Sequence, residues 1–325
     1  MKRVSVLFVV CLCLAATAMA QQVTFRFTDG IRDAALKTKM QTNISQLLTE
    51  INRAAAADLE LQLDKMRMTP QARTALENLW RSSHFRCEYT ENAQPCLTDI
   101  QGYEVRGIAV MMLSNSAMKN RLREVCINLS RQGEITSVHM ALNNNIYRGQ
   151  LDKSRNATDL RRKTEILSFV ERFRSFYDEK DIDALRQIYS DDALIITGRV
   201  ITHKKYKNDA PTLEKEVVYR RQNKEEYLNN LENTFKSNRY IHLTFDDIQI
   251  YGHKSKANFY GVSLKQKWDS TNYKDNGYLF LLWEFPDGDN EPPVIHVRTW
   301  QPEWIDNGKQ LNPDDKFNIN DFFIP

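Results

Sequence analysis

The sequence predicts an α+β protein built from two domains, and three observations support this prediction. Apolar residues recur every three to five positions from Ile31 to Ile51, which is the spacing of a long amphipathic helix. Past Ser83 the chain changes to short runs of alternating or β-favouring residues that are typical of antiparallel strands. The same succession of helices and then strands begins again after the polar, Asn-rich stretch 143–159.

The polar stretch between these halves is the predicted domain boundary because it lacks apolar periodicity. We therefore divide the chain into a leader at 1–20, an α+β domain at 21–145, a linker at 146–159 and a second domain at 160–325. Since 42% of the residues are hydrophobic and 10% are aromatic, the chain has enough apolar side chains to fill the cores of both domains.

Residues 1–20 read MKRVSVLFVVCLCLAATAMA, with a basic start, an apolar run from Val4 to about Ala16, and small residues at Ala18 and Ala20. This pattern is typical of a secretory signal peptide and predicts cleavage after Ala20, with an uncleaved anchor as the alternative. The apolar run is too short for a comfortable membrane span, and no later segment is apolar enough to cross a membrane. We expect an exported protein, periplasmic or extracellular.

The charge balance and the motifs exclude several classes of function. The formal net charge is +3, and it falls to +1 once Lys2 and Arg3 of the leader are set aside. A chain so close to neutral has no general attraction to nucleic acid or to an anionic membrane. It also lacks a nucleotide-binding glycine loop, a nucleophile elbow and paired zinc-binding histidines, so we expect no cofactor and no metal.

Three cysteines follow the leader, at Cys87, Cys96 and Cys126. Export permits a disulfide, and Cys87 and Cys96 flank the turn-like sequence EYTENAQP, so a bridge across a hairpin is one expectation. Three reduced thiols inside a core are the other. A hydrolase that uses Cys126 or Cys87 with His139 is conceivable, but a buried structural cysteine is favoured.

The helices and strands of the first domain have recognisable signals. The second helix is expected at TPQARTALENLW, where Thr69 can act as the N-cap and Pro70 fits the first turn. Strands are expected at HFRCEYT, GYEVRGIAVMML, LREVCINLS and EITSVHMAL, and Gly133 can adopt a positive φ in the turn between the last two. Helices followed by such a meander predict the α+β class for this domain.

In the second domain, a helix with an aromatic stripe precedes a short helix that Asp181 can cap. A strand at DALIIT, a helix at 224–235 and four further strands up to Trp300 are expected to follow. The stretch FRSFYDEKDIDALRQIYSDDALIITG, residues 173–198, resembles the opening of the nuclear transport factor 2-like and ketosteroid isomerase-like superfamily, also called cystatin-like. The resemblance covers about 160–304. It implies a strongly curved antiparallel sheet around helices, forming a cone with a pocket at its open end.

The same resemblance implies specific catalytic positions, and this chain does not fill them. The isomerase pattern has a carboxylate base four residues after the Asp-Asp-Ala alanine, where this chain has Thr197. It has a tyrosine that stabilises a developing oxyanion where this chain has Phe173. Neither side chain can serve the role, so we expect no ketosteroid isomerase activity.

Four acids of this stretch have a structural interpretation. Asp181 and Asp183 fall at an N-cap and in a first helical turn, where unpaired N–H groups and the helix dipole favour negative charge. Asp191 and Asp192 fall between a helix and a strand, where Asp side chains commonly bond to nearby backbone. We therefore expect these carboxylates to shape the fold rather than to carry out a reaction.

Two strands carry candidate ligand-binding residues. His296, Arg298 and Trp300 alternate along the last strand, so they are expected to share one face, and Gln266 and Trp268 share a face of an earlier strand. Aromatic, guanidinium and imidazole groups of this kind can line a polar pocket or a glycan-binding surface. The alternative is that the tryptophans belong to the core and that the arginine is paired.

The sequence GYLFLLWEF, residues 277–285, is apolar on both strand faces, unlike a solvated antiparallel sheet. One face would cover the helices, and the other would meet the N-terminal domain, a second copy or another protein. We therefore expect a homodimer or interdomain packing through this sheet.

These observations favour an exported, non-catalytic protein that binds a small molecule or a protein partner in a cone-shaped C-terminal domain. One alternative is an enzyme of the ketosteroid isomerase-like fold that acts on a small molecule, with His296 or an unplaced acid as its base. The other is a surface glycan-binding protein.

Overall fold

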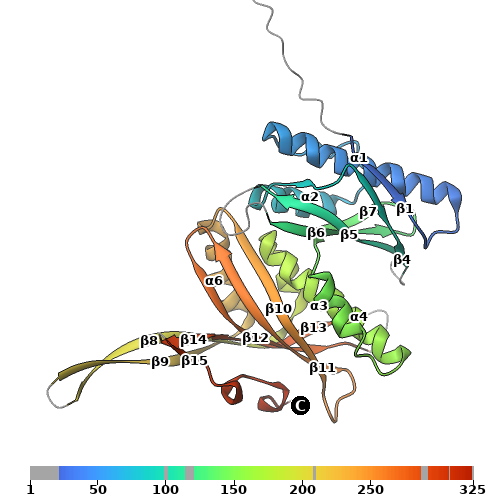
Figure 1. The fold of residues 1–325 in the computed structure, drawn as a ribbon. Coiled ribbons are helices and arrows are strands. Elements are labelled where there is room, and N and C mark those ends of the chain that lie inside the picture. The colour runs from blue at the N-terminus through green and yellow to red at the C-terminus, as the bar shows by residue number, and fades with distance from the viewer. Residues whose placement is uncertain are drawn as a thin grey trace, which may run out of the picture.

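The α+β class is confirmed, because helices and curled antiparallel sheets form two units along the chain (Figure 1). The computed structural model describes residues 22–98, 102–113, 121–207, 210–286, 292–306 and 308–323. The predicted leader at 1–20 and its cleavage site lie outside these residues. Within the described ranges, no helix combines the length and the apolar character that a membrane crossing requires.

The first unit lays two helices over a curved sheet (Figure 1). The helix α1 (Ala34–Ala57) begins after Asp33, and α2 (Pro70–Ser82) begins after Thr69 with a proline at its first position, as predicted. Gly133 makes the turn between the last two strands with a φ of 76°. The strand order is β2 (Phe85–Cys87), β5 (Gly102–Met112), β6 (Leu122–Ser130) and β7 (Ile135–Met140), and β4 (Cys96–Thr98) also pairs with β5.

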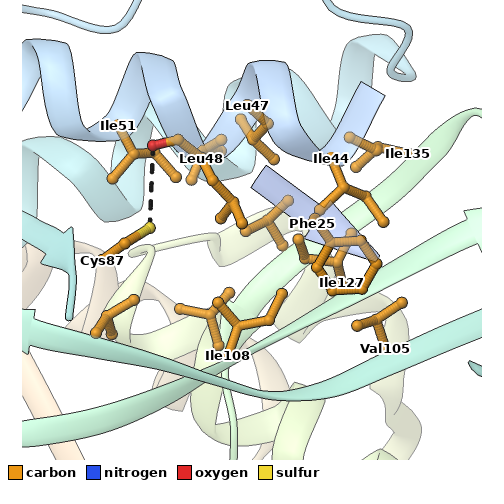
Figure 2. Packing of buried hydrophobic residues seen from close by; sticks show 14 of the residues in the cluster. Phe25, Ile44, Leu47, Leu48, Ile51, Cys87, Val105, Ile108, Ile127 and Ile135 are labelled. Atoms are coloured by element: carbon orange, nitrogen blue, oxygen red, sulfur yellow. Dashed lines mark hydrogen bonds between the residues drawn. The ribbon is translucent and has the colours of Figure 1, made fainter. Parts of the chain in front are cut away.

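The core of this unit lies between α1 and the sheet (Figure 2). The apolar stripe of α1 is buried, as its spacing predicted, and it faces side chains of β5 and β6. Figure 2 labels Ile44, Leu47, Leu48 and Ile51 on the helix and Val105, Ile108 and Ile127 on the strands. Trp80 of α2 is also buried, and its indole N–H donates to the Leu59 carbonyl at 3.0 Å.

The expected bridge between Cys87 and Cys96 is absent, because both are free thiols. They lie opposite Val110 and Val105 on the same edge of β5. Five residues along a strand span roughly 16 Å, whereas a disulfide requires Cα atoms within about 7 Å of each other. Burial raises the pKa of Cys87 to about 12, so this thiol packs as a small, protonated core group.

A short strand that no sequence pattern predicted, β1 (Thr24–Phe27), lies beside α1. One edge of β1 pairs in parallel with β3 (Glu91–Gln94). On the other edge, backbone N–H groups donate at 2.8–2.9 Å to polar side chains of α1, in the pairs Val23–Thr49, Phe25–Ser45 and Phe27–Gln41. Successive partners lie four residues apart on α1 and two residues apart on β1. Four residues of a helix rise about 6 Å and two residues of a strand about 6.6 Å, so the donors and acceptors stay aligned. The helix thereby satisfies an edge that would otherwise be open.

The second unit wraps a curved sheet around helices, as the resemblance implied (Figure 1). Its strand order is β10 (Ile241–Gly252), β11 (Phe259–Ser270), β12 (Lys274–Glu284), β13 (Val294–Pro302), β8 (Tyr189–Lys207) and β9 (Ala210–Gln222). One hydrophobic core joins the concave face of this sheet to α4 (Ala157–Asp178), α5 (Ile182–Ile188) and α6 (Lys224–Ser237).

The stretch expected to be a linker, 146–159, overlaps the helix α3 (Asn144–Leu151) and includes the start of α4 (Ala157–Asp178). This helix packs against α4 and β10, and the buried side chain of Gln150 donates to the Ile248 carbonyl at 2.6 Å. The first hydrophobic core includes residues up to Met140 and the second begins at Leu142, so the division between them in the sequence falls just before α3.

The acids of the 173–198 stretch have structural partners. Asp181 caps α5 by accepting a first-turn N–H, as predicted. Asp191 accepts a hydrogen bond from the ammonium of Lys224 at 2.8 Å, which joins the start of β8 to α6. Asp192 accepts a hydrogen bond from Ser190, and this bond lowers the pKa of the carboxyl.

The outward face of the second sheet is covered by the chain's own C-terminal tail. After β13 the tail forms β14 (Trp304–Asp306), β15 (Lys309–Gln310) and two short 3-10 helices at Pro313–Asp315 and Ile319–Asp321. Three tail residues, Phe317, Ile319 and Phe322, pack against Phe280, Leu282 and Val297 of the sheet. The other apolar set of the 277–285 run, including Trp283, faces the helices. Both faces of this run are thus buried within one chain, and pairing of two copies through it stays a prediction.

The strands β8 and β9 continue past the body of the second unit as a two-stranded ribbon (Figure 1). The pairing of β13 with β8 runs from Tyr189 to Thr197, whereas the pairing of β8 with β9 continues to Lys207 and Ala210. Only the part of β8 at DALIIT was predicted, because the ribbon beyond it has no buried face to impose an alternating pattern.

Candidate functional site

Four of the five predicted binding residues lie together on the concave face of the second sheet. Their cross-strand neighbours belong to the core around the helices, and the four are Gln266, Trp268, Arg298 and Trp300. His296 does not join them, so its predicted placement is wrong. A register shift between Leu282 and Trp283 adds one residue to β13 at this point. The bulge turns His296 to the other face, where its Nε2 lies 2.7 Å from Glu284.

Arg298 is the main polar group on the concave face. Its side chain is buried, and its guanidinium carbon lies 4.9 Å from the centre of the Tyr227 ring. The hydroxyl of Tyr177 lies near the guanidinium and helps to raise the pKa of Arg298. Among the described residues, Nε and Nη1 of Arg298 have no hydrogen-bond partner. Because unused donors on a buried charge are costly, these two atoms can attract an acceptor group.

Three tyrosine hydroxyls lie next to this guanidinium. The Tyr177 hydroxyl is 2.7 Å from that of Tyr227 and 3.3 Å from that of Tyr189. Burial raises the pKa of Tyr189 and of Tyr227 well above the usual value, so both phenols stay protonated. A neutral hydroxyl can both donate and accept, so the three tyrosines extend the hydrogen-bonding network of Arg298 without adding charge.

Two indoles and one carboxyl complete the site. The Trp300 ring lies over Gly277, where an added Cβ would come within 2.7 Å of the indole. The indole nitrogens of Trp300 and Trp268 are buried and have no partner in the described part of the chain, and neither does Oδ1 of Asp275. Burial raises the pKa of Asp275 to about 6. We call Arg298, Trp300, Trp268 and Asp275 the Arg298 cluster.

At the two positions that the isomerase pattern assigns to catalysis, the side chains of this chain make packing and hydrogen-bond contacts within the fold. The Phe173 ring packs edge-on against Tyr177 and Tyr189. The Thr197 hydroxyl lies 3.5 Å from the side-chain oxygen of Gln222. Neither position provides a carboxylate base or an acidic hydroxyl, and the lack of ketosteroid isomerase activity stays a prediction.

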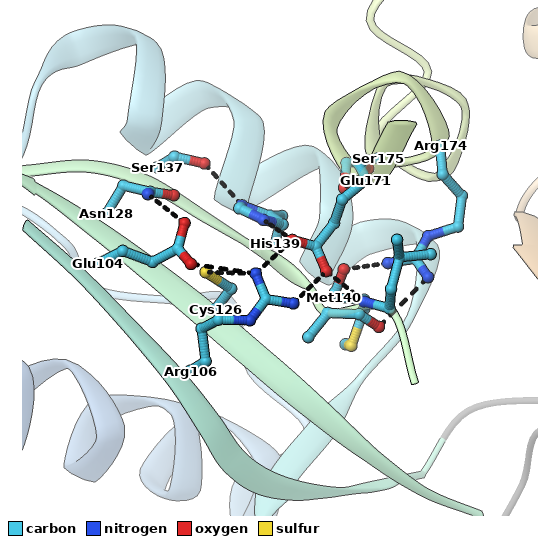
Figure 3. A network of polar contacts seen from close by, with 12 residues as sticks. Glu104, Arg106, Cys126, Asn128, Ser137, His139, Met140, Glu171, Arg174 and Ser175 are labelled. Carbon is cyan, nitrogen blue, oxygen red and sulfur yellow. Dashed lines mark hydrogen bonds and ion pairs between the residues drawn. The ribbon is translucent and has the colours of Figure 1, made fainter. Parts of the chain in front are cut away.

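A second polar cluster lies between the two units (Figure 3). Glu171 of α4 accepts two hydrogen bonds from Arg106 of β5, at 2.8 and 2.9 Å, and lies 3.4 Å from the Nε2 atom of His139 on β7. One turn further along α4, Arg174 donates to the Ala141 carbonyl at 3.2 Å. These contacts join the first unit to α4 of the second unit.

Cys126, His139 and Glu171 bring a thiol, an imidazole and a carboxylate within 4.8 Å of one another, a donor set that could bind a metal. The guanidinium of Arg106 already fills this space, bonded to Glu171 and 3.9 Å from the sulfur of Cys126. Burial raises the pKa of the Cys126 thiol well above its usual value. Burial alone would also raise the pKa of Glu171, but His139 and Arg106 hold it well below its usual range. A buried, protonated thiol and a carboxylate whose charge is balanced by Arg106 fit a structural role.

Sequence reasoning missed the three tyrosines, Asp275 and the interdomain cluster. Tyr177 and Tyr227 lie at buried positions of α4 and α6, and their hydroxyls meet only after these two helices pack. A signal for the interdomain cluster was present, because Glu171 and Arg174 interrupt the apolar stripe of α4 one turn apart. Charged residues inside such a stripe require partners from another element.

The chain has no match among family models and none among curated proteins. It is similar to solved structures at low identity. A nuclear transport factor 2-like protein of unknown function from Pseudomonas putida is 11% identical, with 46% of this chain and 93% of that chain covered and a TM-score of 0.33. A Bdellovibrio bacteriovorus protein is 13% identical, with 64% of this chain and 74% of that chain covered and a TM-score of 0.33. A Nostoc punctiforme protein of unknown function with a cystatin-like fold is 11% identical, with 45% of this chain and 92% of that chain covered and a TM-score of 0.30.

Proposed function

We propose that this chain is an exported, non-catalytic binding protein that holds a small ligand with acceptor oxygens, such as a carboxylate, at the Arg298 cluster. The buried guanidinium of Arg298, with two donor atoms unpartnered among the described residues, carries this proposal. Asp275 interacts with Arg298 through its charge but accepts no hydrogen bond from Nε or Nη1, whereas an arginine kept for stability alone would be expected to pair directly with a carboxylate. Proteins commonly keep a destabilising buried group of this kind where function requires it.

The surroundings of Arg298 restrict the ligand further. The concave core is already filled by aromatic rings such as Phe173 and Phe235, so the ligand is small. The indoles of Trp268 and Trp300 offer flat apolar surfaces beside the charged group. Because these tryptophans face the helices, they support an enclosed ligand rather than a glycan on an exposed surface.

Benzoate is a suitable probe because it joins a carboxylate to a flat ring. We expect the chain from Gln21 onward to bind benzoate in isothermal titration calorimetry, and Arg298→Met to weaken that binding by about tenfold or more. Without benzoate, Arg298→Met should be as stable as the parent or more stable, because an apolar side chain of similar volume replaces a buried charge. Arg199→Met, on the exposed ribbon, is the control and should bind normally.

Two results would contradict this function. One is unchanged benzoate binding in Arg298→Met. The other is a parent protein that binds neither benzoate, acetate nor phosphate while Arg298→Met loses several kcal/mol of stability, which would make Arg298 a structural residue.

An acid–base enzyme is the second candidate, and Asp275 favours it. Burial raises the pKa of Asp275 to about 6, which suits a general base near neutral pH. In such a reaction Asp275 would accept a proton from a carbonyl substrate, and Arg298 would stabilise the negative charge that develops. Turnover that disappears in Asp275→Asn while benzoate binding persists would favour the enzyme over the binding protein.

Export is part of the same proposal, and the leader pattern at 1–20 supports it. Mass spectrometry of the protein recovered outside the cytoplasm should find a chain that begins at Gln21. A retained Met1, or a lipid attached to a cysteine, would count against export by this route.

A further inference from the structure

The outer edge of β9 is a second surface, independent of the Arg298 cluster. β9 is the last strand of the six-stranded sheet, and in the described ranges no strand pairs with its outer edge. Beyond Thr197 the described ribbon has two strands, and a two-stranded ribbon on its own is only marginally stable in water. An unpaired edge of this length is a template for another strand.

Apolar side chains are also exposed along β9. Leu213, Val218 and Tyr219 are 70%, 42% and 39% exposed, so part of the ribbon's apolar surface is uncovered in a single copy. Charged residues commonly block such an edge, and β9 carries Glu214 and Lys215 near its middle. Whether these charges prevent or direct pairing depends on the residues they would face.

The register of a symmetric pair can be deduced from these charges. Opposite residues of an antiparallel pair point to the same face, so a two-fold axis between two β9 strands must pass through a residue. An axis at Glu214, Lys215 or Glu216 would place that residue against its own copy, and like charges would meet. An axis at Val218 would place Lys215 against Arg221 of the second copy, and this repulsion would offset the attraction that the same axis gives between Glu216 and Arg220.

An axis at Val217 avoids all of these contacts. It places Glu214 opposite Arg220 of the second copy, and the symmetry repeats this ion pair. It also places Lys215, whose ammonium pairs with Asp306 of its own chain at 2.7 Å, opposite the uncharged Tyr219 of the second copy, so no like charges meet there. We propose that two copies of this chain pair antiparallel through the outer edges of β9, with the two-fold axis at Val217, so that their two sheets become one.

Charge exchange tests this register directly. Sedimentation and light scattering of the chain from Gln21 onward should show a dimer. Glu214→Arg or Arg220→Glu alone should weaken dimerisation by about tenfold or more, because each places like charges opposite one another twice. An equimolar mixture of the two variants should dimerise again, since every opposed pair then joins an arginine to a glutamate. Glu216→Arg is the matched control and should dimerise normally, because it faces Val218 of the second copy.

A cross-link provides a measurement that does not depend on charge. Val217→Cys should form a disulfide-linked dimer under mild oxidation with copper phenanthroline, because the axis brings the two thiols together while Cys87, Cys96 and Cys126 are buried. Val218→Cys should cross-link far less. The proposal is overturned if the parent is monomeric at every concentration, or if the mixture of charge variants fails to restore the dimer.

Discussion

Single residues of the second sheet are constrained by close approach of their neighbours. At Gly277 an added Cβ would lie 2.3 Å from the Gln301 carbonyl and 2.7 Å from the Trp300 indole. The missing side chain is therefore what allows Trp300 to enter the Arg298 cluster. The bulge beside His296 acts at the same scale, since one extra residue removes an imidazole from the face that strand alternation predicted for it. Neither effect could be read from alternation, which assumes a regular strand.

We expect Gly277→Ala to lower the free energy of unfolding by about 1–3 kcal/mol, because the strand or the indole must move. Gly149→Ala is the matched control. Nothing lies within 4 Å of the Cβ added there, so alanine should gain up to about 1 kcal/mol through its helix preference within α3. Urea denaturation measures both variants, and equal changes in the two would refute the packing argument.

Among the elements, those with one buried face were predictable. The helices α1, α2 and α6 and the strands β10 to β13 lie where their periodicity placed them. The strand β1, the ribbon and the tail were missed because each depends on groups distant in the sequence. Side chains of α1 hold β1, and the sheet's outward face holds the tail. The run at 277–285 indicated two buried faces, but the spacing of apolar residues does not show which segment packs against each face.

The tail can be tested with two adjacent phenylalanines. Phe322 stacks on Phe280 with ring centres 5.5 Å apart, whereas Phe323 is 91% exposed. Phe322→Ser should cost about 1–3 kcal/mol and increase the fluorescence of a hydrophobic dye as Phe280 becomes exposed. Phe323→Ser should change neither the stability nor the fluorescence. The same response in both variants would show that the tail does not protect this face.

The whole molecule is held together by polar contacts between its two units. Arg106 and Glu171 form the buried ion pair of Figure 3. Elsewhere along the boundary, the Ser83 hydroxyl of the first unit lies 2.8 Å from a ring nitrogen of His242 in the second. Directional contacts of this kind favour one orientation of the two units, and breaking one of them should leave a buried group without its partner.

Glu171→Gln should destabilise the protein by about 1–3 kcal/mol, because the buried Arg106 loses its bidentate partner and keeps only the contact with Glu104 at 3.1 Å. Adding Arg106→Met should recover part of that loss. Glu165→Gln is the control on the same helix, where the ion pair with Arg162 is partly exposed and worth less than about 1 kcal/mol. Calorimetry should resolve separate transitions for the two units in Glu171→Gln, and a single unshifted transition would argue against the coupling.

If the chain is exported as proposed, the way β1 is held constrains the order of cleavage and folding. Val23 lies three residues after the proposed cleavage site at Ala20. Its side chain is fully buried, and its backbone N–H donates a hydrogen bond to the Thr49 hydroxyl. A protease acts on chain that is extended and accessible. If the leader is removed after Ala20 as proposed, its removal is expected to precede the docking of β1 on α1. In that case cleavage would be a kinetic prerequisite for completing the first domain.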